Sequence, residues 1–338
     1  MAIKIYPNRI EFEKYSLLIT SNGLLVTSNA DPSNSSAYGC LTFADRTNGA
    51  SFQGTVAGFV SAGWVSPPYV TTNRIDKFPF FAVGSATCVG AIYQSRYGTS
   101  GQSSQVSGYN SSGYLAGPTW VATIDKFPFS IAAGSTGTNV GSLTRSRQYT
   151  AGHSSSENGY VSGGWGPPTC TDSRIDRFPF ATDSGSTCVG NLLIAKESHA
   201  GHSSTTNGYE SSQNCITKFP FATSSNSSFV GSQFASRGYA AGVSSSTHGY
   251  TAGGSPVTSV IEKFPFASDT SASCVGNLTV LCFAMTGVSA TTHGYSAGGG
   301  PNAATIGVID RFPFASDGSA TCIGCLTQGR YTPAGQQD

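Results

Sequence analysis

Charged side chains are scarce in this chain of 338 residues. Only 10% of the residues are Asp, Glu, Lys or Arg, and 18 basic against 17 acidic residues leave a formal net charge of +1 at pH 7. A chain without a large excess of one sign exerts no broad attraction on nucleic acid or on an anionic membrane. We therefore expect no nucleic-acid partner.

Long apolar runs are missing as well. The longest, such as residues 16–26, are too short and too interrupted to cross a bilayer. The opening residues, MAIKIYPNRIEFEKY, carry charges where a signal peptide needs an apolar core. We expect a soluble chain with no membrane insertion and no standard secretion, made in the cytoplasm.

The cysteines lack the spacing of a zinc site. Nine cysteines cannot all pair with one another, and no CxxC pair has matching histidines. One repeat position holds Asn139 and Phe229 in two copies and a cysteine in the other four: Cys88, Cys188, Cys274 and Cys322. A position that tolerates Asn and Phe is not a metal ligand. We expect reduced cysteines that pack as small apolar groups.

Signatures of catalysis are absent too. There is no G-x-G-x-x-G motif before a helix, no P-loop, and no evident set of carboxylates or metal ligands that would converge on a central channel. His153 and His202 share one repeat position, which favours turns over catalysis, and His199 has no evident partner. We expect no enzyme activity, no catalytic residue, no metal and no cofactor.

What the sequence does contain is a repeat. IDKFPF at 75–80 returns at 124–129, 175–180, 216–221, 261–266 and 309–314, with D/E/T at its second position and K/R at its third. The first Phe of successive copies is separated by 49, 51, 41, 45 and 48 residues. A period near this length is typical of stacked or circular supersecondary units.

Each copy contains four short apolar segments separated by turn residues. In the third copy they are AGHSS, GYVSGG, RIDRFPF and STCVGNL, and no helical period persists. Such segments predict a four-stranded antiparallel sheet. One sheet cannot bury both faces alone, but six arranged radially do so and protect most edges. The sequence therefore predicts an all-β fold, a six-bladed β-propeller with an N-terminal hairpin extension.

The charged pair within the motif has two possible roles. Six copies could form a ring-shaped ligand site, but function rarely needs every copy, so a structural lock between blades is favoured. The predicted lock consists of Asp76, Lys77, Asp125, Lys126, Asp176, Arg177, Glu262, Lys263, Asp310 and Arg311.

The order of these segments resembles the kelch repeat, over roughly residues 39–338. A strand with diglycine, a strand that ends near Pro and a following basic residue all match, although the usual downstream Trp is replaced by Cys-Val-Gly and the fourth copy lacks the diglycine. The Ser/Gly-rich form with its repeated FPFA is similar to kelch-like propellers carried by marine bacteriophages, cyanophages especially. This resemblance implies a virion component.

Residues 1–38 lie outside the repeat and precede GCLT at 39–42, which recurs at 324–327. The Asn22-Gly23 pair between two β-rich runs predicts a hairpin. This segment either caps the propeller seam or anchors it to a capsid or tail protein. The candidate anchor residues are Lys4, Arg9, Leu18, Leu24 and Val26.

All three tryptophans fall in one type of loop. Trp64, Trp120 and Trp165 follow the second predicted strand of three consecutive blades, next to prolines, and Tyr69 joins them. These four residues form a candidate binding rim, because exposed aromatic side chains on stiff loops stack on sugars or dock a partner. The alternative is that each Trp packs on its neighbouring blade.

Together these features predict a non-enzymatic phage virion structural protein. Its propeller would be attached to other virion proteins of the capsid or tail through residues 1–38 and would display loops for decoration or attachment to a host-surface glycan or protein. The alternative is a glycan-binding, lectin-type module.

Overall fold

The computed structural model describes residues 52–338, except Thr169 and Ala303, and the backbone of five strands within residues 4–41. The chain divides into two compact units, Met1–Gly49 and Ala50–Asp338. The predicted boundary between residues 38 and 39 lies outside the described residues.

In the first unit the strands pair antiparallel in chain order: β1 (Lys4–Tyr6), β2 (Arg9–Glu11), β3 (Tyr15–Thr20), β4 (Gly23–Ser28) and β5 (Cys40–Leu41). Thr20 lies opposite Gly23 in the β3–β4 pair, at the position of the expected hairpin. The candidate anchor residues belong to β1–β4, of which the backbone alone is described, so their role stays a prediction.

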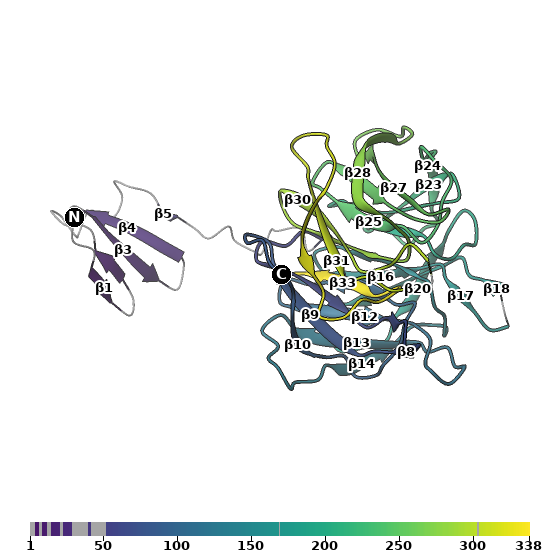
Figure 1. Cartoon of the computed structure of the whole chain (residues 1–338), viewed down its shortest axis with the longest axis horizontal. Coiled ribbons are helices and arrows are strands. Elements are labelled where there is room, and N and C mark those ends of the chain that lie inside the picture. Colours follow the sequence, from purple (N-terminus) through teal and green to yellow (C-terminus); the bar gives the residue numbers. More distant parts are fainter. Residues whose placement is uncertain are drawn as a thin grey trace. The chain divides into compact units, whose positions relative to one another are not determined.

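The second unit is a six-bladed β-propeller, as predicted, and its described residues contain no helix. Each blade is a four-stranded antiparallel sheet (Figure 1). From the innermost strand outward, the first three blades are β33 (Ala334–Gln337), β6 (Ala57–Ser61), β9 (Arg74–Pro79), β10 (Thr87–Ala91); β11 (Ser100–Ser103), β12 (Ser107–Ser111), β13 (Thr123–Pro128), β14 (Thr138–Ser142); and β15 (Ala151–Ser154), β16 (Asn158–Ser162), β19 (Arg174–Pro179), β20 (Thr187–Asn191). The last three are β21 (Ala200–Ser203), β22 (Asn207–Ser212), β23 (Cys215–Pro220), β24 (Ser228–Gly231); β25 (Ala241–Ser244), β26 (His248–Ala252), β27 (Thr258–Pro265), β28 (Ser273–Cys282); and β29 (Thr286–Ser289), β30 (His293–Ala297), β31 (Val308–Pro313), β32 (Thr321–Cys325).

The C-terminal strand closes the ring. β33 pairs with β6, so the first blade takes its innermost strand from the end of the chain, and Figure 1 shows yellow β33 among the blue strands of that blade. The innermost strands contact one another in a closed circuit: β33, β11, β15, β21, β25, β29 and β33 again. The sequence left open which terminus closes the seam, and this pairing answers the question for the propeller.

Two sets of contacts hold the innermost strands together. Backbone N–H groups donate to a side-chain oxygen of the next blade in the circuit Ser103, Ser154, Ser203, Ser244, Ser289, Gln337 and Ser103. A glycine of each strand also packs on the carbonyl oxygen of the preceding one: Gly335, Gly101, Gly152, Gly201, Gly242 and Gly287. A Cβ at any of these glycines would lie 2.0–2.5 Å from that oxygen, so no larger residue fits.

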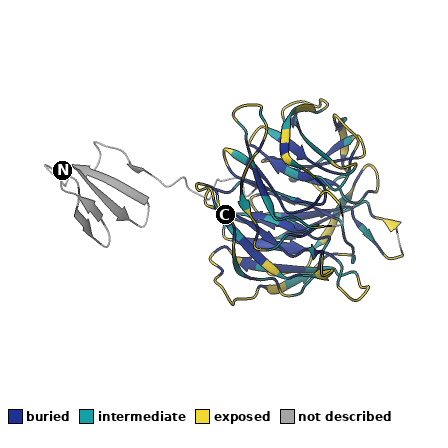
Figure 2. Cartoon of the chain, viewed as in Figure 1, coloured by how far each residue is buried: buried dark blue, intermediate teal, exposed yellow. Residues whose placement is uncertain are grey.

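The FPF motif explains the packing between blades. Its first Phe lies opposite the glycine of the GY pair, or of Gly58-Phe59 in the first blade, and a Cβ on Gly58 would be 2.3 Å from the Phe78 ring. Its second Phe stacks on an aromatic residue of the preceding blade, as Phe221 does on Tyr160 at 4.6 Å. The same contacts recur around the ring, so buried residues fill the space between blades while exposed ones gather at turns (Figure 2). The strand ends at the proline in each copy.

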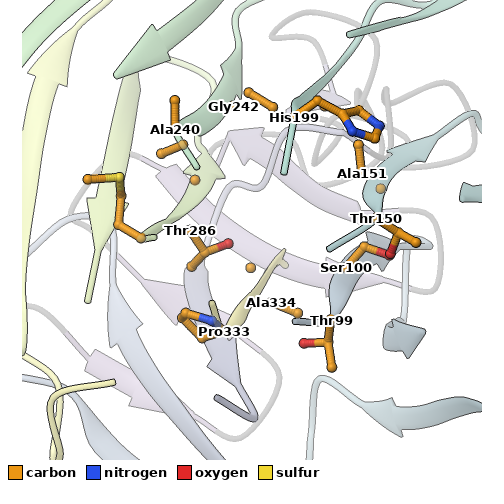
Figure 3. Close-up of a pocket in the computed structure, with 18 residues that line it drawn as sticks. Thr99, Ser100, Thr150, Ala151, His199, Ala240, Gly242, Thr286, Pro333 and Ala334 are labelled. Atoms are coloured by element: carbon orange, nitrogen blue, oxygen red, sulfur yellow. The ribbon is translucent and has the colours of Figure 1, made fainter. Parts of the chain in front are cut away.

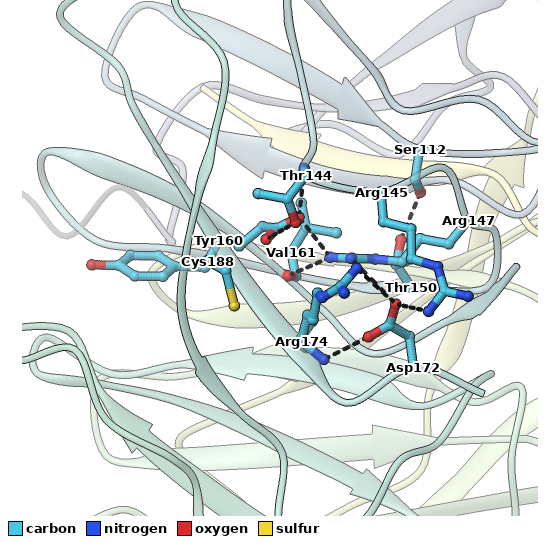
Figure 4. A network of polar contacts seen from close by, with 12 residues as sticks. Ser112, Thr144, Arg145, Arg147, Thr150, Tyr160, Val161, Asp172, Arg174 and Cys188 are labelled. Atoms are coloured by element: carbon cyan, nitrogen blue, oxygen red, sulfur yellow. Dashed lines mark hydrogen bonds and ion pairs between the residues drawn. The ribbon is translucent and has the colours of Figure 1, made fainter. Parts of the chain in front are cut away.

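The two charged residues of the motif face different partners. The acidic residue is buried against an arginine of the connection that precedes its own blade, with N–O distances of 2.7 Å in Asp76–Arg330 and 3.1 Å in the others: Asp125–Arg96, Asp176–Arg147 and Glu262–Arg237. Around Arg147 the network extends to Arg145, Asp172 and Arg174 (Figure 4). Asp310 has no arginine there but accepts from the backbone and hydroxyl of Thr279, as Asp176 does from Thr144.

The basic residue faces outward. Lys126 and Lys263 pair with Asp183 and Asp317 of the next blade, and Lys77 lies 5.1 Å from the centre of the Phe59 ring. The motif arginines, Arg177 and Arg311, lie near tyrosines: burial raises the pKa of Tyr160 and Tyr295, and the charges of these arginines oppose that rise. Exposed ion pairs of this kind contribute little to stability, so the buried acidic residues matter more.

Candidate functional site

The predicted rim residues lie in short hairpins that follow the second strand of a blade. Trp64 opens β7 (Trp64–Val65), which pairs with β8 (Val70–Thr71), and Trp165 opens β17 (Trp165–Gly166), which pairs with β18 (Cys170–Thr171). The three tryptophans are half-buried, whereas Tyr69 is 63% exposed. Their loops therefore leave aromatic surface accessible.

Tyr97 and Tyr114, which were not among the predicted rim residues, join the rim residues into one row. Trp64 contacts Tyr69, and Trp120 meets Trp165 edge-on at 5.2 Å. Tyr97 lies 6.3 Å from Trp64 and 5.7 Å from Tyr114, which contacts Trp120. We call this set the tryptophan row: Tyr69, Trp64, Tyr97, Tyr114, Trp120 and Trp165.

Six aromatic side chains form a closed circuit on the side of the propeller that carries Trp64. We call them the axial aromatic ring: Trp64, Tyr97, Tyr149, Tyr239, Phe283 and Tyr331. In that order the centroid distances are 6.3, 6.2, 5.5, 6.4, 5.4 and 6.1 Å, the last from Tyr331 back to Trp64. Five members come from the connections between blades, so the circuit follows the propeller around its axis.

A ring of backbone hydrogen bonds supports these side chains. One residue of each inter-blade connection donates its N–H to the carbonyl of the next, over 2.6–3.2 Å: Gly98, Thr332, Ala284, Tyr239, Ser198, Tyr149 and back to Gly98. All six have positive φ, from 45° to 67°. We call this the left-handed circuit. Because each N–H and carbonyl of the circuit is used, the frame beneath the aromatic ring is fixed.

The hydroxyls of Tyr97 and Tyr149 in the ring remain protonated. Burial raises the pKa of Tyr149 far above the ordinary tyrosine value, and the neighbouring Tyr97 and Tyr239 raise it further. Burial also raises the pKa of Tyr97, while a hydrogen bond with Tyr149 opposes that shift. At neutral pH these phenols are therefore available as hydrogen-bond donors and acceptors.

A small cavity of about 110 Å³ lies on the axis next to the left-handed circuit. In each blade its lining starts with the residue that follows the circuit: Thr99, Thr150, His199, Ala240, Met285 and Pro333 (Figure 3). Ser100 and Thr286 add hydroxyl groups, and the glycines of the innermost strands complete the wall. The volume suits a few water molecules rather than a sugar ring.

A buried group of ionisable residues lies between the third and fourth blades. The Nε2 atoms of His153 and His199 are 3.7 and 4.0 Å from Glu210 Oε1. Burial raises the pKa of Glu210 to about 7 and lowers that of His153 to about 4. The expectation that His153 and His202 belong to turns and that His199 has no partner is wrong. β15 and β21 carry His153 and His202 into the interior, and His153 and His199 face Glu210.

The described residues contain no group of three or more His, Cys, Asp or Glu side chains placed to hold a metal ion. No described helix is long and apolar enough to span a membrane. The eight described cysteines are free thiols, but Cys188, Cys274 and Cys322 are exposed. The expectation that the repeated cysteines pack as small apolar groups is wrong for these three, because the outermost strand of each blade faces solvent.

Most of the axial aromatic ring was missed from the sequence. Tyr97 and Tyr331 directly follow the buried arginine of their connection, Tyr149 and Tyr239 follow it by two residues, and Phe283 follows Cys282. The available signal was an aromatic residue soon after the basic residue of each connection. The aromatic residue follows at a distance of one residue in some connections and two in others, so the pattern was not evident.

The chain matches no protein-family model and no curated protein. Its resemblance to kelch repeats and to phage propellers therefore rests on the sequence patterns alone.

Proposed function

We propose that this protein is a non-enzymatic structural component of a phage virion. Its propeller is attached to capsid or tail proteins through residues 1–38 and presents one face for decoration or host attachment. The phage assignment is supported by the kelch-like, FPFA-rich repeat. The role in attachment is supported by one structural observation, the axial aromatic ring on a closed and rigid frame.

The charged residues of the propeller support a structural rather than a catalytic role. The four buried acid–arginine pairs hold strands to inter-blade connections. The axial cavity is lined by hydroxyl groups, small residues and glycine backbone, together with His199 and Met285. General acid–base chemistry needs ionisable groups that reach a substrate; none of the described carboxylates lines the cavity, and Glu210, which faces the cavity-lining His199, is fully buried.

A free glycan-binding module is the second candidate function. It uses the same aromatic face but needs no virion partner for residues 1–38. Aromatic side chains that are half-exposed on a rigid frame favour either a host-surface glycan or a host protein. The two functions differ in where the protein is found.

Mass spectrometry of purified virus particles separates them. Three forms are compared: the full chain, a chain without residues 1–38, and the Trp64→Ala/Trp120→Ala/Trp165→Ala variant as matched control. We expect the full chain and the tryptophan variant in particles, and the truncated chain only in the soluble fraction as a folded propeller. Equal incorporation of the truncated chain contradicts the anchor, and absence of the full chain contradicts the virion assignment.

A further inference from the structure

Two members of the axial aromatic ring have a strained backbone. Tyr149 and Tyr239 have φ values of 56° and 53°, in the left-handed region where a bulky L residue is disfavoured. Gly98 occupies the equivalent place in another blade with φ of 67° and no such strain. Strain of this kind clusters at functional sites. Ser198, Ala284 and Thr332 adopt the same conformation, so the turn does not require a tyrosine, and the rings of Tyr149 and Tyr239 are additional to it.

Their side chains combine apolar and polar surface. Tyr149 contacts the rings of Tyr97 and Tyr239 at centroid distances of 6.2 and 5.5 Å, and all three are partly exposed. The hydroxyls of Tyr97 and Tyr149 stay protonated because burial raises their pKa values. A saccharide offers the matching surfaces, since it has an apolar C–H face bounded by hydroxyl groups.

The electrostatic surroundings favour a neutral ligand. The arginines of the same connections, Arg96, Arg147 and Arg330, are fully buried against carboxylates and do not reach a ligand. The charge of Glu197 raises the pKa of Tyr149. Anionic sugars need a positive partner such as arginine, and a carboxylate in this position repels them. Sialylated or sulfated ligands are therefore disfavoured.

The axial cavity limits how the ligand sits. Its volume of about 110 Å³ holds a few waters, and the closely packed glycines of the innermost strands form part of its wall. A sugar ring therefore stays on the aromatic side, in contact with the partly exposed tyrosines.

We infer that the axial aromatic ring is a binding site for a neutral saccharide, which stacks on Tyr149 and Tyr239 and hydrogen-bonds to their hydroxyls. This inference rests on the proposed attachment function and names its ligand class. It places the site on the propeller axis, whereas the sequence placed the candidate rim on the hairpins with Trp64, Trp120 and Trp165.

The test is binding of the full-length protein to an array of neutral and sialylated oligosaccharides, followed by calorimetry with lactose, the best-bound neutral array sugar and sialyllactose. We expect binding of neutral sugars and no gain from sialylation. Binding of acidic sugars only, or of no sugar, overturns the inference.

Variants then locate the site. Asn tolerates the left-handed conformation, so Tyr149→Asn and Tyr239→Asn remove a ring without disturbing the circuit. Each should weaken sugar binding about tenfold or more, since stacking and a hydrogen bond are lost together. Tyr93→Asn is the matched control, because Tyr93 is 60% exposed outside the ring, and it should bind like the parent.

A loss of binding in the triple tryptophan variant together with full binding by Tyr149→Asn and Tyr239→Asn overturns the axial site. Thermal melts check that the Asn variants fold. If they do not, Tyr149→Gly and Tyr239→Gly replace them, because Gly98 occupies the equivalent place with φ of 67°, and the same loss of binding is expected. Sugar binding by the purified protein and its presence in particles are independent measurements, so failure of the inference and failure of the virion assignment are distinguishable.

Discussion

Glu210 lies directly opposite Thr217 in the β22–β23 pair. In the other five blades the position of Thr217 is occupied by the buried acidic residue of the motif: Asp76, Asp125, Asp176, Glu262 and Asp310. The fourth blade therefore carries its carboxylate one strand closer to the axis, beside His153 and His199. It also replaces the buried arginine of the connection with Lys196, whose Nζ has no hydrogen-bond partner among the described residues.

Removal of the Glu210 carboxylate should destabilise the fourth blade. Lys196 is 3% exposed, and its charge lowers the pKa of Glu210 against the larger effect of burial. At pH 8 Glu210 is ionised, and the burial that raises its pKa to about 7 offsets part of its attraction to Lys196. Glu210→Gln leaves that cation buried without a carboxylate, and we expect a net loss of about 1–3 kcal/mol in the free energy of unfolding. Urea denaturation at pH 8 measures the loss.

The double variant Glu210→Gln/Lys196→Met is the control for this pair. It removes both charges, so it should lose less stability than Glu210→Gln alone. Equal or greater destabilisation of the double variant would show that the two residues are not coupled.

Acid should destabilise the propeller through its buried histidines. Burial lowers the pKa of His153 to about 4 and of His202 to about 3, from 6.5. The stability they contribute is complete above pH 6.5 and is lost progressively as the pH falls toward these values. Glu210 acts in the opposite direction: its pKa rises from 4.5 to about 7, so its contribution is present below pH 4.5 and lost as the pH rises through 7.

Burial also lowers the pKa of His199 and raises that of Asp125 and Glu262. Both carboxyls face a buried arginine that limits the rise, so the three buried histidines dominate and melting temperatures should fall steadily between pH 6.5 and pH 4. The His153→Gln variant should show a shallower slope than the parent over this range. His248→Gln is the control, since His248 lies at the start of β26 and is only partly buried. A parent whose melting temperature is constant from pH 6.5 to 4 contradicts this account.

Alanine substitutions at glycine should be graded by what the new Cβ meets. In Gly242→Ala it would lie 2.2 Å from the carbonyl oxygen of Gly201, in Gly249→Ala 2.3 Å from the Phe264 ring, and in Gly318→Ala it meets nothing within 4 Å. Overpacking costs about 1–3 kcal/mol, more where the obstacle is backbone. We expect the largest loss in Gly242→Ala, a smaller one in Gly249→Ala and almost none in Gly318→Ala. Thermal denaturation gives the order, and equal effects at all three positions would contradict it.

The fold was predictable because one motif carries several constraints. The glycine of each GY pair, the alternation in IDKFPF and its terminal proline agree on strand positions and on contacts between blades. The odd fourth blade was also visible, because ITKFPF has Thr217 where other copies have an acidic residue. The role of Glu210 was not visible in the sequence, because only the pairing of β22 with β23 places its carboxylate opposite Thr217.

The candidate site was predictable only in part. Trp64, Trp120 and Trp165 share a loop type, so their common side of the propeller followed from the repeat. Tyr149 and Tyr239 reach the axis because of their left-handed backbone, and no local sequence pattern marks that conformation at a tyrosine. The two tyrosines also contact each other although they are not neighbours in the left-handed circuit, because Ser198 lies between them there.

Deletion of residues 334–338 should abolish the closed propeller. β33 is the innermost strand of the first blade, and Gln336 bonds there to Ser61 and to the carbonyl of Tyr109. Without it the edge of β6 is exposed, which favours aggregation. Size-exclusion chromatography and circular dichroism should show an aggregated or partly folded protein. A monomer with the parent's melting temperature would contradict closure by β33.

Cryo-electron microscopy of the intact virus particle, with density traced for residues 1–38, tests the central proposal most directly. The account predicts that these residues run into a neighbouring capsid or tail protein while the axial aromatic ring of the propeller faces the surroundings. If the chain is absent from particles, or if the aromatic ring is covered by another virion protein, the proposed attachment function is contradicted.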